Sequence, residues 1–155
     1  MDKVDRKIIR ALQANARLSN QELAERVSLS PSPCLRRVRK LEEDGILAAY
    51  TAKVDQEQYG LPMNVFVSVQ LEKQNDNSIK EFETGINALD QVMECYLMTG
   101  SRDYLMRVVS ADLKSYEAFI RDELTKIPGI ASIESSFAFG NVKSRTVFPL
   151  VAKFD

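Results

Sequence analysis

The sequence has 155 residues, of which 45% are hydrophobic and 28% charged, and its net charge is −1. This composition excludes a disordered or collagen-like chain and fits one ordinary domain or two small ones. With two cysteines, no histidine and no apolar run of the roughly 18 residues that span a bilayer, we expect a cytoplasmic protein with no disulfide framework, metal site or cofactor, and no membrane contact.

The charges are divided unevenly along the chain. Residues 1–50 contain ten Lys and Arg against seven Asp and Glu, whereas residues 51–155 contain eleven against fifteen. A polyanion would therefore meet the first part, although solvated surfaces often vary by this much.

The first part predicts three helices joined by short connections. Apolar residues recur at helical spacing in each, and Ser19 with Glu22 forms the S-x-x-E pattern that begins the second. The predicted spans are 3–15, 19–27 and 30–44. Three helices so connected are typical of a helix-turn-helix, whose last helix enters the major groove of DNA.

The third helix begins with two prolines. With Ser30 as the N-cap, Pro31 and Pro33 fall in the first turn, where helix amides have no partner to lose, although Ser32 before a proline is biased away from helix. After Gly45 we expect one or two short strands over residues 46–54 and then a linker that ends at residue 62.

The third helix divides cleanly into two faces. Cys34, Leu35, Val38 and Leu41 share an apolar face that we expect to be buried. We predict that the opposite face and the helix start bind DNA, through Ser30, Ser32, Pro33, Arg36, Arg37, Arg39 and Lys40. In this prediction Ser32, Pro33, Arg36 and Arg37 lie closest to the bases, and the hydroxyls, first-turn amides and remaining cations hold phosphates. The alternative is a surface helix with a solvated cationic face.

In the second part of the chain, after residue 62, the spacing of the apolar residues changes. Alternating apolar residues predict strands, and helical stripes lie between them. The spans, in order, are strand 64–72, helix 78–89, strands 92–100 and 103–110, helix 112–129 and strand 130–139. This order is the ferredoxin-like βαββαβ arrangement, an antiparallel sheet with both helices on one face. The other face is a candidate protein interface, and the tail would pack back or extend an edge.

Two local features admit more than one interpretation. The turn TGSRDY, residues 99–104, is by pattern a hairpin turn, but its amides could hold a carboxylate and Asp103 an ammonium group. Cys34 and Cys95 could be redox sensors, but we expect both to be small buried hydrophobic residues.

Three segments of the sequence resemble a known family. They are DRKIIRALQANARLSNQELAERVSLSPSPCLRRVRKLEEDGIL, VMECYLMTGSRDYLMRV and PGIASIESSFAF. Together they resemble the Lrp/AsnC family of bacterial and archaeal transcription regulators over nearly the whole chain. The combination of SPxPCxxRVxxLExxGI with TGxxDYL is specific to that family.

The resemblance implies an N-terminal DNA-reading domain and a C-terminal domain that pairs through its sheet into dimers, commonly assembling to octamers. It also implies small effectors, usually amino acids, bound between neighbouring C-terminal domains. The effector residues carried over are Gly100, Ser101, Arg102, Asp103 and Tyr104, with Ser135 and Ser136 as facing hydroxyls. Ser-Arg at 101–102 departs from the acidic or small residues of many relatives, which could alter effector preference or abolish the response.

We therefore predict an α+β protein with an N-terminal helix-turn-helix (winged-helix-like) domain over 1–62 and a ferredoxin-like effector-binding and oligomerisation domain over 63–155. Its expected function is effector-responsive regulation of amino-acid metabolism through double-stranded DNA. One alternative is an architectural DNA-binding oligomer that ignores effectors. An enzyme or its regulatory subunit is the other, and the sequence shows no acid, base or nucleophile cluster for catalysis.

Overall fold

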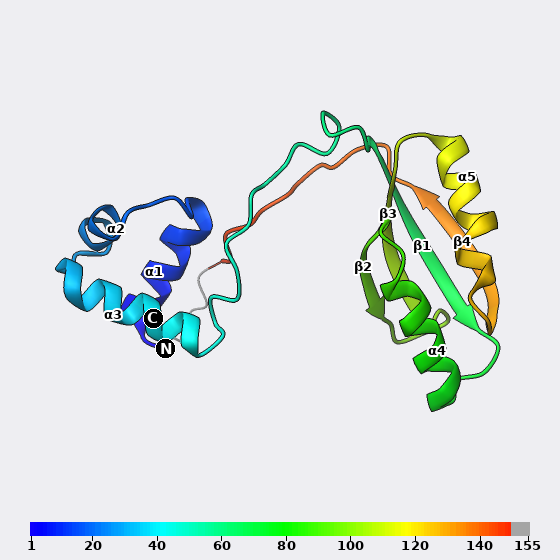
Figure 1. The fold of residues 1–155 in the computed structure, drawn as a ribbon, viewed down its shortest axis with the longest axis horizontal. Coiled ribbons are helices and arrows are strands. Elements are labelled where there is room, and N and C mark those ends of the chain that lie inside the picture. The colour runs from blue at the N-terminus through cyan, green and yellow to red at the C-terminus, as the bar shows by residue number, and fades with distance from the viewer. Residues whose placement is uncertain (150–155) are drawn as a thin grey trace. The chain divides into compact units, whose positions relative to one another are not determined.

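A computed structural model describes residues 1–149 and contains two compact units. The first unit is residues 1–53 with residues 143–149, and the second is Val54–Val142 (Figure 1). The domain boundaries expected from the sequence, 1–62 and 63–155, remain a prediction. The structure adds that the chain passes between the two units twice. No helix among residues 1–149 is long and apolar enough to cross a membrane.

The first unit contains the three predicted helices. They are α1 (Lys3–Ala14), α2 (Asn20–Val27) and α3 (Pro31–Glu43). The capping box of Ser19 and Glu22 is confirmed, because each side chain accepts a hydrogen bond from the other's backbone. Ser30 is the N-cap of α3, and the helix continues through Ser32 without interruption.

The core of the first unit is small and comes from all three helices. It comprises Ile8, Ala11, Leu12, Leu23, Ala24, Val27, Cys34 and Leu41. The predicted burial of Cys34 is confirmed, since its side chain is 0% exposed. The predicted burial of Leu35 is wrong. This residue lies at the margin of the apolar face and is 37% exposed.

The strands predicted over residues 46–54 are absent. The backbone after Gly45, which has φ 69°, ends α3 instead: the amides of Ile46 and Leu47 both donate to the Leu41 carbonyl, at 2.9 and 3.0 Å. Leu47 then packs on the first core. No described strand lies beside 46–54, so its backbone has no ladder to join.

The C-terminal segment belongs to the first unit and packs on α1. Gln13 Nε2 donates to the Thr146 carbonyl at 3.0 Å, and the Phe148 amide donates to Gln13 Oε1 at 3.2 Å. Arg10 donates to the Phe148 carbonyl. The tail was expected to pack back or extend a sheet edge, and the structure shows the former.

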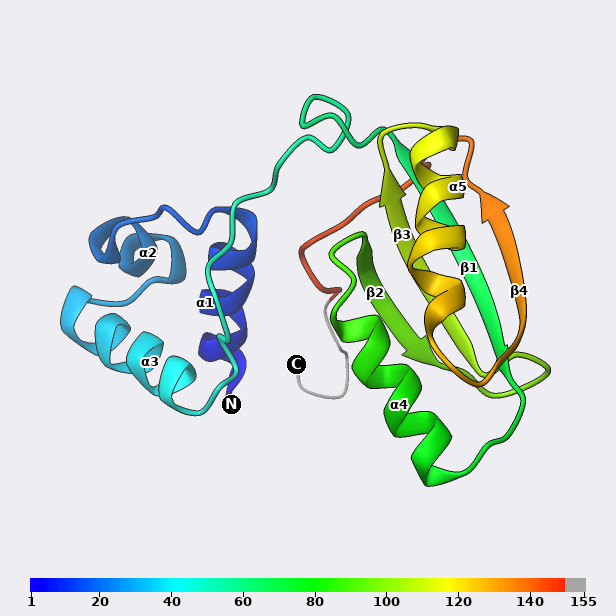
Figure 2. The same cartoon turned by 45° about the vertical axis from the view of Figure 1, so that its right-hand side comes forward.

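The second unit is an antiparallel four-stranded sheet with two helices on one face, as predicted (Figure 2). Its strand order is β2-β3-β1-β4. The elements are β1 (Met63–Leu71), α4 (Asp76–Asn87), β2 (Val92–Leu97), β3 (Tyr104–Ser110), α5 (Leu113–Asp122), the short 3-10 helix η1 (Leu124–Lys126) and β4 (Ile130–Phe137). The predicted helix 112–129 therefore ends early, and η1 follows it.

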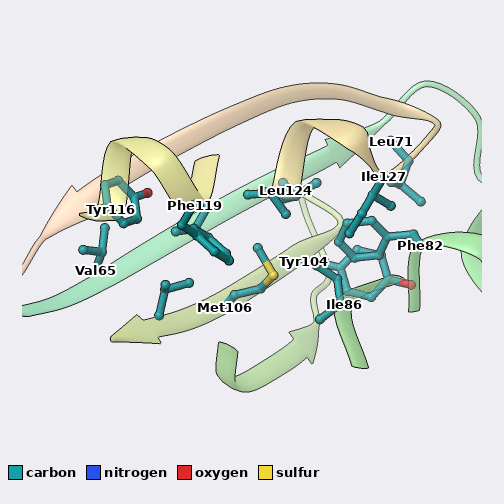
Figure 3. Close-up of a cluster of buried hydrophobic side chains, with 13 residues drawn as sticks. Val65, Leu71, Phe82, Ile86, Tyr104, Met106, Tyr116, Phe119, Leu124 and Ile127 are labelled. Atoms are coloured by element: carbon teal, nitrogen blue, oxygen red, sulfur yellow. The ribbon is translucent and has the colours of Figure 1, made fainter. Parts of the chain in front are cut away.

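The core of the second unit lies between the sheet and its helices (Figure 3). Alternate β1 residues Val65, Val67 and Val69 are fully buried against the helices. At Gly85 a Cβ atom would lie 2.9 Å from the Ile127 side chain. Only glycine therefore lets α4 pack so closely against Ile127. The opposite sheet face carries Phe66 and Tyr96, 40% and 53% exposed.

The predicted burial of Cys95 is wrong. Cys95 lies in the edge strand β2 and is exposed, because β2 has a partner on one side only. Neighbouring side chains nevertheless keep water away from its sulfur. This desolvation raises the pKa of the thiol to about 11, and the nearby Glu83 carboxylate is a second cause.

Candidate DNA and effector sites

The cationic side chains of α3 form one exposed surface. Within residues 1–149, Arg36 and Arg39 make no hydrogen bond or ion pair, and Lys40 pairs only with Asp44 at 3.1 Å. A shallow hollow on this helix is lined by Ser32, Leu35, Arg36, Arg39, Lys40 and Glu43. Unpaired guanidinium groups on an exposed helix suit phosphate and base-edge contacts.

The start of α3 offers few free amides for an anion. Pro31 and Pro33 have no N–H, and the Cys34 amide already donates to the Ser30 carbonyl at 3.2 Å. The Ser32 amide is therefore the one left in the first turn for an anion. The Ser30 side chain makes no capping bond, so its hydroxyl remains available.

Arg37 is oriented differently from Arg36 and Arg39. Its Nη1 atom donates to Asp2 and to Asp5 at the start of α1, at 2.7 Å each. These hydrogen bonds and charges raise the pKa of Arg37. Its predicted contact with DNA stays untested, but its guanidinium is engaged inside the first unit. No local pattern in the sequence indicates this, because the partners lie more than thirty positions away.

In the predicted effector turn, Asp103 holds the turn to the end of β1. Its Oδ2 accepts from the Leu71 amide at 2.7 Å, and its Oδ1 accepts from Gln74 Nε2 at 2.6 Å. Its own amide donates to the Val69 carbonyl at 2.9 Å. Both carboxylate oxygens are thus occupied in the isolated chain, which leaves Gly100 and Ser101 as the more available members of the turn.

Tyr104 is part of the core. The side chain is 2% exposed, its ring lies 4.5 Å from that of Phe82, and its hydroxyl donates to Glu83 at 2.9 Å. Burial, followed by the hydrogen bond to Glu83, raises the pKa of Tyr104. Its hydroxyl therefore stays protonated at physiological pH and positions α4 against β3.

Arg102 contacts three polar residues that were not predicted as part of the site. Its guanidinium pairs with Glu134 at 3.0 Å. It also donates to Ser132 Oγ at 2.7 Å and to Gln70 Oε1 at 3.3 Å. These partners become neighbours because β1 pairs with β4 in a register that sets Gln70 opposite Ser132 and Ser68 opposite Glu134. No spacing in the sequence reveals that register.

Ser135 and Ser136 do not act together in this chain. Ser135 lies on the helix side, where its Oγ is 2.6 Å from the Tyr116 hydroxyl. Ser136 lies opposite the exposed Phe66 and so faces the other side of the sheet. The sequence prediction treated them as one pair of hydroxyls, but successive strand residues point to opposite faces. Their role toward an effector stays a prediction.

Residues 1–149 contain no group of three or more His, Cys, Asp or Glu side chains that could hold a metal ion.

Comparison with known proteins gives two family matches and several close relatives. Residues 1–48 match the winged helix-turn-helix DNA-binding family, and residues 64–148 match the Lrp/AsnC ligand binding domain. The Bkd operon transcriptional regulator of Pseudomonas aeruginosa is 48% identical over 97% of this chain and 98% of its own. The leucine-responsive regulatory protein of Escherichia coli is 34% identical over 92% and 87%. A transcriptional regulator of Neisseria meningitidis solved with L-Met has a TM-score of 0.91, at 36% identity over 96% of both chains.

Proposed function

The chain belongs to the Lrp/AsnC family of DNA-binding transcription regulators, and we propose that it controls amino-acid metabolism in response to an amino acid. Its relatives include regulators named for the Bkd operon and for leucine, and one was solved with L-Met. These names support an amino-acid effector and a role in regulation without catalysis. Because DNA is the partner, we place its action in the cytoplasm.

The proposal for DNA is that α3 reads the major groove. The observation that carries it is the pair of exposed guanidinium groups of Arg36 and Arg39, which have no partner among residues 1–149, on a helix whose other face packs Cys34 and Leu41 into the core. Arg36 lies nearer the helix start and contacts a base edge, whereas Arg39 and Lys40 hold phosphates. Ser30, Ser32 and Pro33 lie beside the groove.

The proposal for the effector is that an amino acid binds at the turn Gly100–Tyr104 between neighbouring second units. Arg102 offers the charge for a ligand carboxylate, which would exchange with Glu134. The sheet face that carries Phe66 and Tyr96 pairs with a second copy, which gives dimers that assemble further to octamers. Ser136, which lies on that same face, then acts from the partner side of the site, whereas Ser135 would contact an effector from the helix side of its sheet.

Binding of DNA duplexes by the intact protein tests the first proposal. We expect Arg36→Ala to weaken preference for one sequence over another by about 1–3 kcal/mol. Arg39→Ala should weaken binding to every sequence and reduce the salt slope by about 0.9 for each phosphate that is no longer bound. Arg121→Ala, on α5 of the second unit, is the control. Unchanged binding in both α3 variants would reject the proposal.

A two-fold dimer also predicts the form of its DNA sites. The whole sites should be pseudo-palindromic, and their half-sites should be separated by about one helical turn, roughly 34–36 Å, or a multiple of it. Genome-wide mapping of bound sites, with and without an amino-acid pool, tests both the sites and the response.

Calorimetry with the twenty amino acids tests the effector proposal. We expect heat from at least one amino acid, lost in Arg102→Ala and kept in Arg121→Ala. An absence of heat from all twenty would favour a second candidate, an architectural DNA-binding oligomer that ignores effectors. The internal engagement of Asp103, Tyr104 and Arg102 is the observation in favour of that candidate.

A further inference from the structure

Two carboxylates at the start of α1 are shared between capping that helix and binding α3. Asp2 Oδ1 accepts from the Val4 and Asp5 amides at 2.8 Å each, while Asp5 Oδ2 accepts from the Asp2 amide at 2.8 Å. The second oxygen of each acid, Asp2 Oδ2 and Asp5 Oδ1, accepts from Arg37. The cap therefore fixes where the guanidinium lies.

This contact is partly shielded from water. The Asp5 side chain is 14% exposed and that of Arg37 is 34% exposed. One Nη1 atom bridges both acids, so a small shift of α3 along α1 would break at least one bond. Neighbouring Arg36 is about 100° further round the helix and has no such partner among residues 1–149.

We propose that Arg37 is a positioning residue: it holds α3 in place for DNA, and its charge is neutralised by Asp2 and Asp5. The phosphate-binding charge of α3 then comes from Arg39 and Lys40, and Arg36 contacts a base edge. The inference rests on the proposed binding of DNA by α3, and it removes Arg37 from the predicted DNA contacts.

The salt dependence of binding distinguishes the two roles of an arginine. A contact with a phosphate releases a counterion, so its removal lowers the slope of log affinity against log salt by about 0.9. A positioning residue releases none. Its removal lowers affinity by the same factor at every salt concentration, which shifts the line without changing its slope.

The experiment measures binding of a mixed-sequence DNA duplex by the intact protein, using fluorescence anisotropy over a series of salt concentrations. We expect Arg39→Gln to lower the slope by about 0.9 per bound subunit. Arg37→Gln should give a line parallel to that of the unaltered protein, at lower affinity, and Arg37→Lys should recover part of that affinity. Equal slope changes in Arg37→Gln and Arg39→Gln would overturn the inference.

A second variant keeps the test decisive if Arg37→Gln unfolds. Combining Asp2→Asn with Asp5→Asn keeps an oxygen to cap α1 but frees the Arg37 charge. We expect a steeper slope, by up to about 0.9 per subunit, that returns to its original value when Arg37→Gln is added. An unchanged slope in the double variant would overturn the inference. Unchanged binding in both Arg36→Gln and Arg39→Gln would instead reject α3 as the DNA surface.

Discussion

The first unit is held mainly by contacts between successive helices, whereas the second is held by strands paired far along the sequence. Among residues 1–149, eight buried residues form the first core, against thirteen in the second. Both units have capped helices, but the first adds the bridge from Arg37 to Asp2 and Asp5, while the second relies on strand register and aromatic packing. The proposed DNA surface therefore lies on a single helix, but the proposed effector turn depends on distant pairings.

Phe82→Ala should give the largest difference in stability between the two units. Phe82 is fully buried against Tyr104, so its truncation should cost the second unit about 3–5 kcal/mol. The first unit should keep its stability. Urea unfolding followed by circular dichroism, together with thiol labelling of Cys34, measures both.

Leu113→Ala on α5 is the matched control, because Leu113 is 62% exposed and should change stability by less than about 0.5 kcal/mol. Equal destabilisation of both units after Phe82→Ala would show that they unfold together, and the distinction between them would fail.

Thiol chemistry offers a second test, since each unit contains one cysteine. With a pKa of about 11 against an ordinary 9.0, the Cys95 thiol should react roughly a hundredfold more slowly than a free thiol near pH 8. Cys34 should be unreactive until the first unit unfolds, because it is buried. Labelling rates of Cys34→Ser and Cys95→Ser separate the two sites. Fast labelling of Cys34 in the folded protein would contradict the packing of α3.

Gln13→Ala tests the hydrogen bonds of the tail. The change removes both bonds between the Gln13 side chain and the C-terminal segment. Because these bonds are exposed, we expect the first unit to be destabilised by about 1 kcal/mol and the second unit to be unaffected. Lys7→Ala, an exposed position on the same helix, is the control for helix effects. Destabilisation of the second unit as well would count against the division.

Acid should produce the weakest of these responses. The hydrogen bond from the Asp5 amide, followed by that from Arg37, holds the pKa of Asp2 below its ordinary 3.8. The resulting stabilisation is complete above pH 3.8 and is lost as the pH falls through the folded value. Asp2→Asn should therefore make the first unit less sensitive to acid, as judged by urea midpoints at pH 5 and 3.

Asp112 provides the matching change in the second unit. Its pKa is lowered mainly by the Ser115 amide, so Asp112→Asn should reduce acid sensitivity there and leave the first unit unchanged. If Asp2→Asn altered the acid response of both units equally, their independence would be disproved.

Sequence reasoning predicted the helix order, the sheet topology and the exposed cations of α3, because helical and strand periods fix which residues share a face. It could not predict that Arg37 meets Asp2 and Asp5, since that contact depends on how α1 crosses α3. The same holds for Arg102, whose partners Ser132 and Glu134 are fixed by the pairing of β1 with β4.

The packing of the tail on α1 also has a consequence for biosynthesis. A ribosome makes α1 to α3 before the second unit, and these helices can form while the second unit is still being translated. Thr146 and Phe148, which bind Gln13, are made only after the whole second unit. A newly made chain therefore completes its first unit only after the second unit has been made.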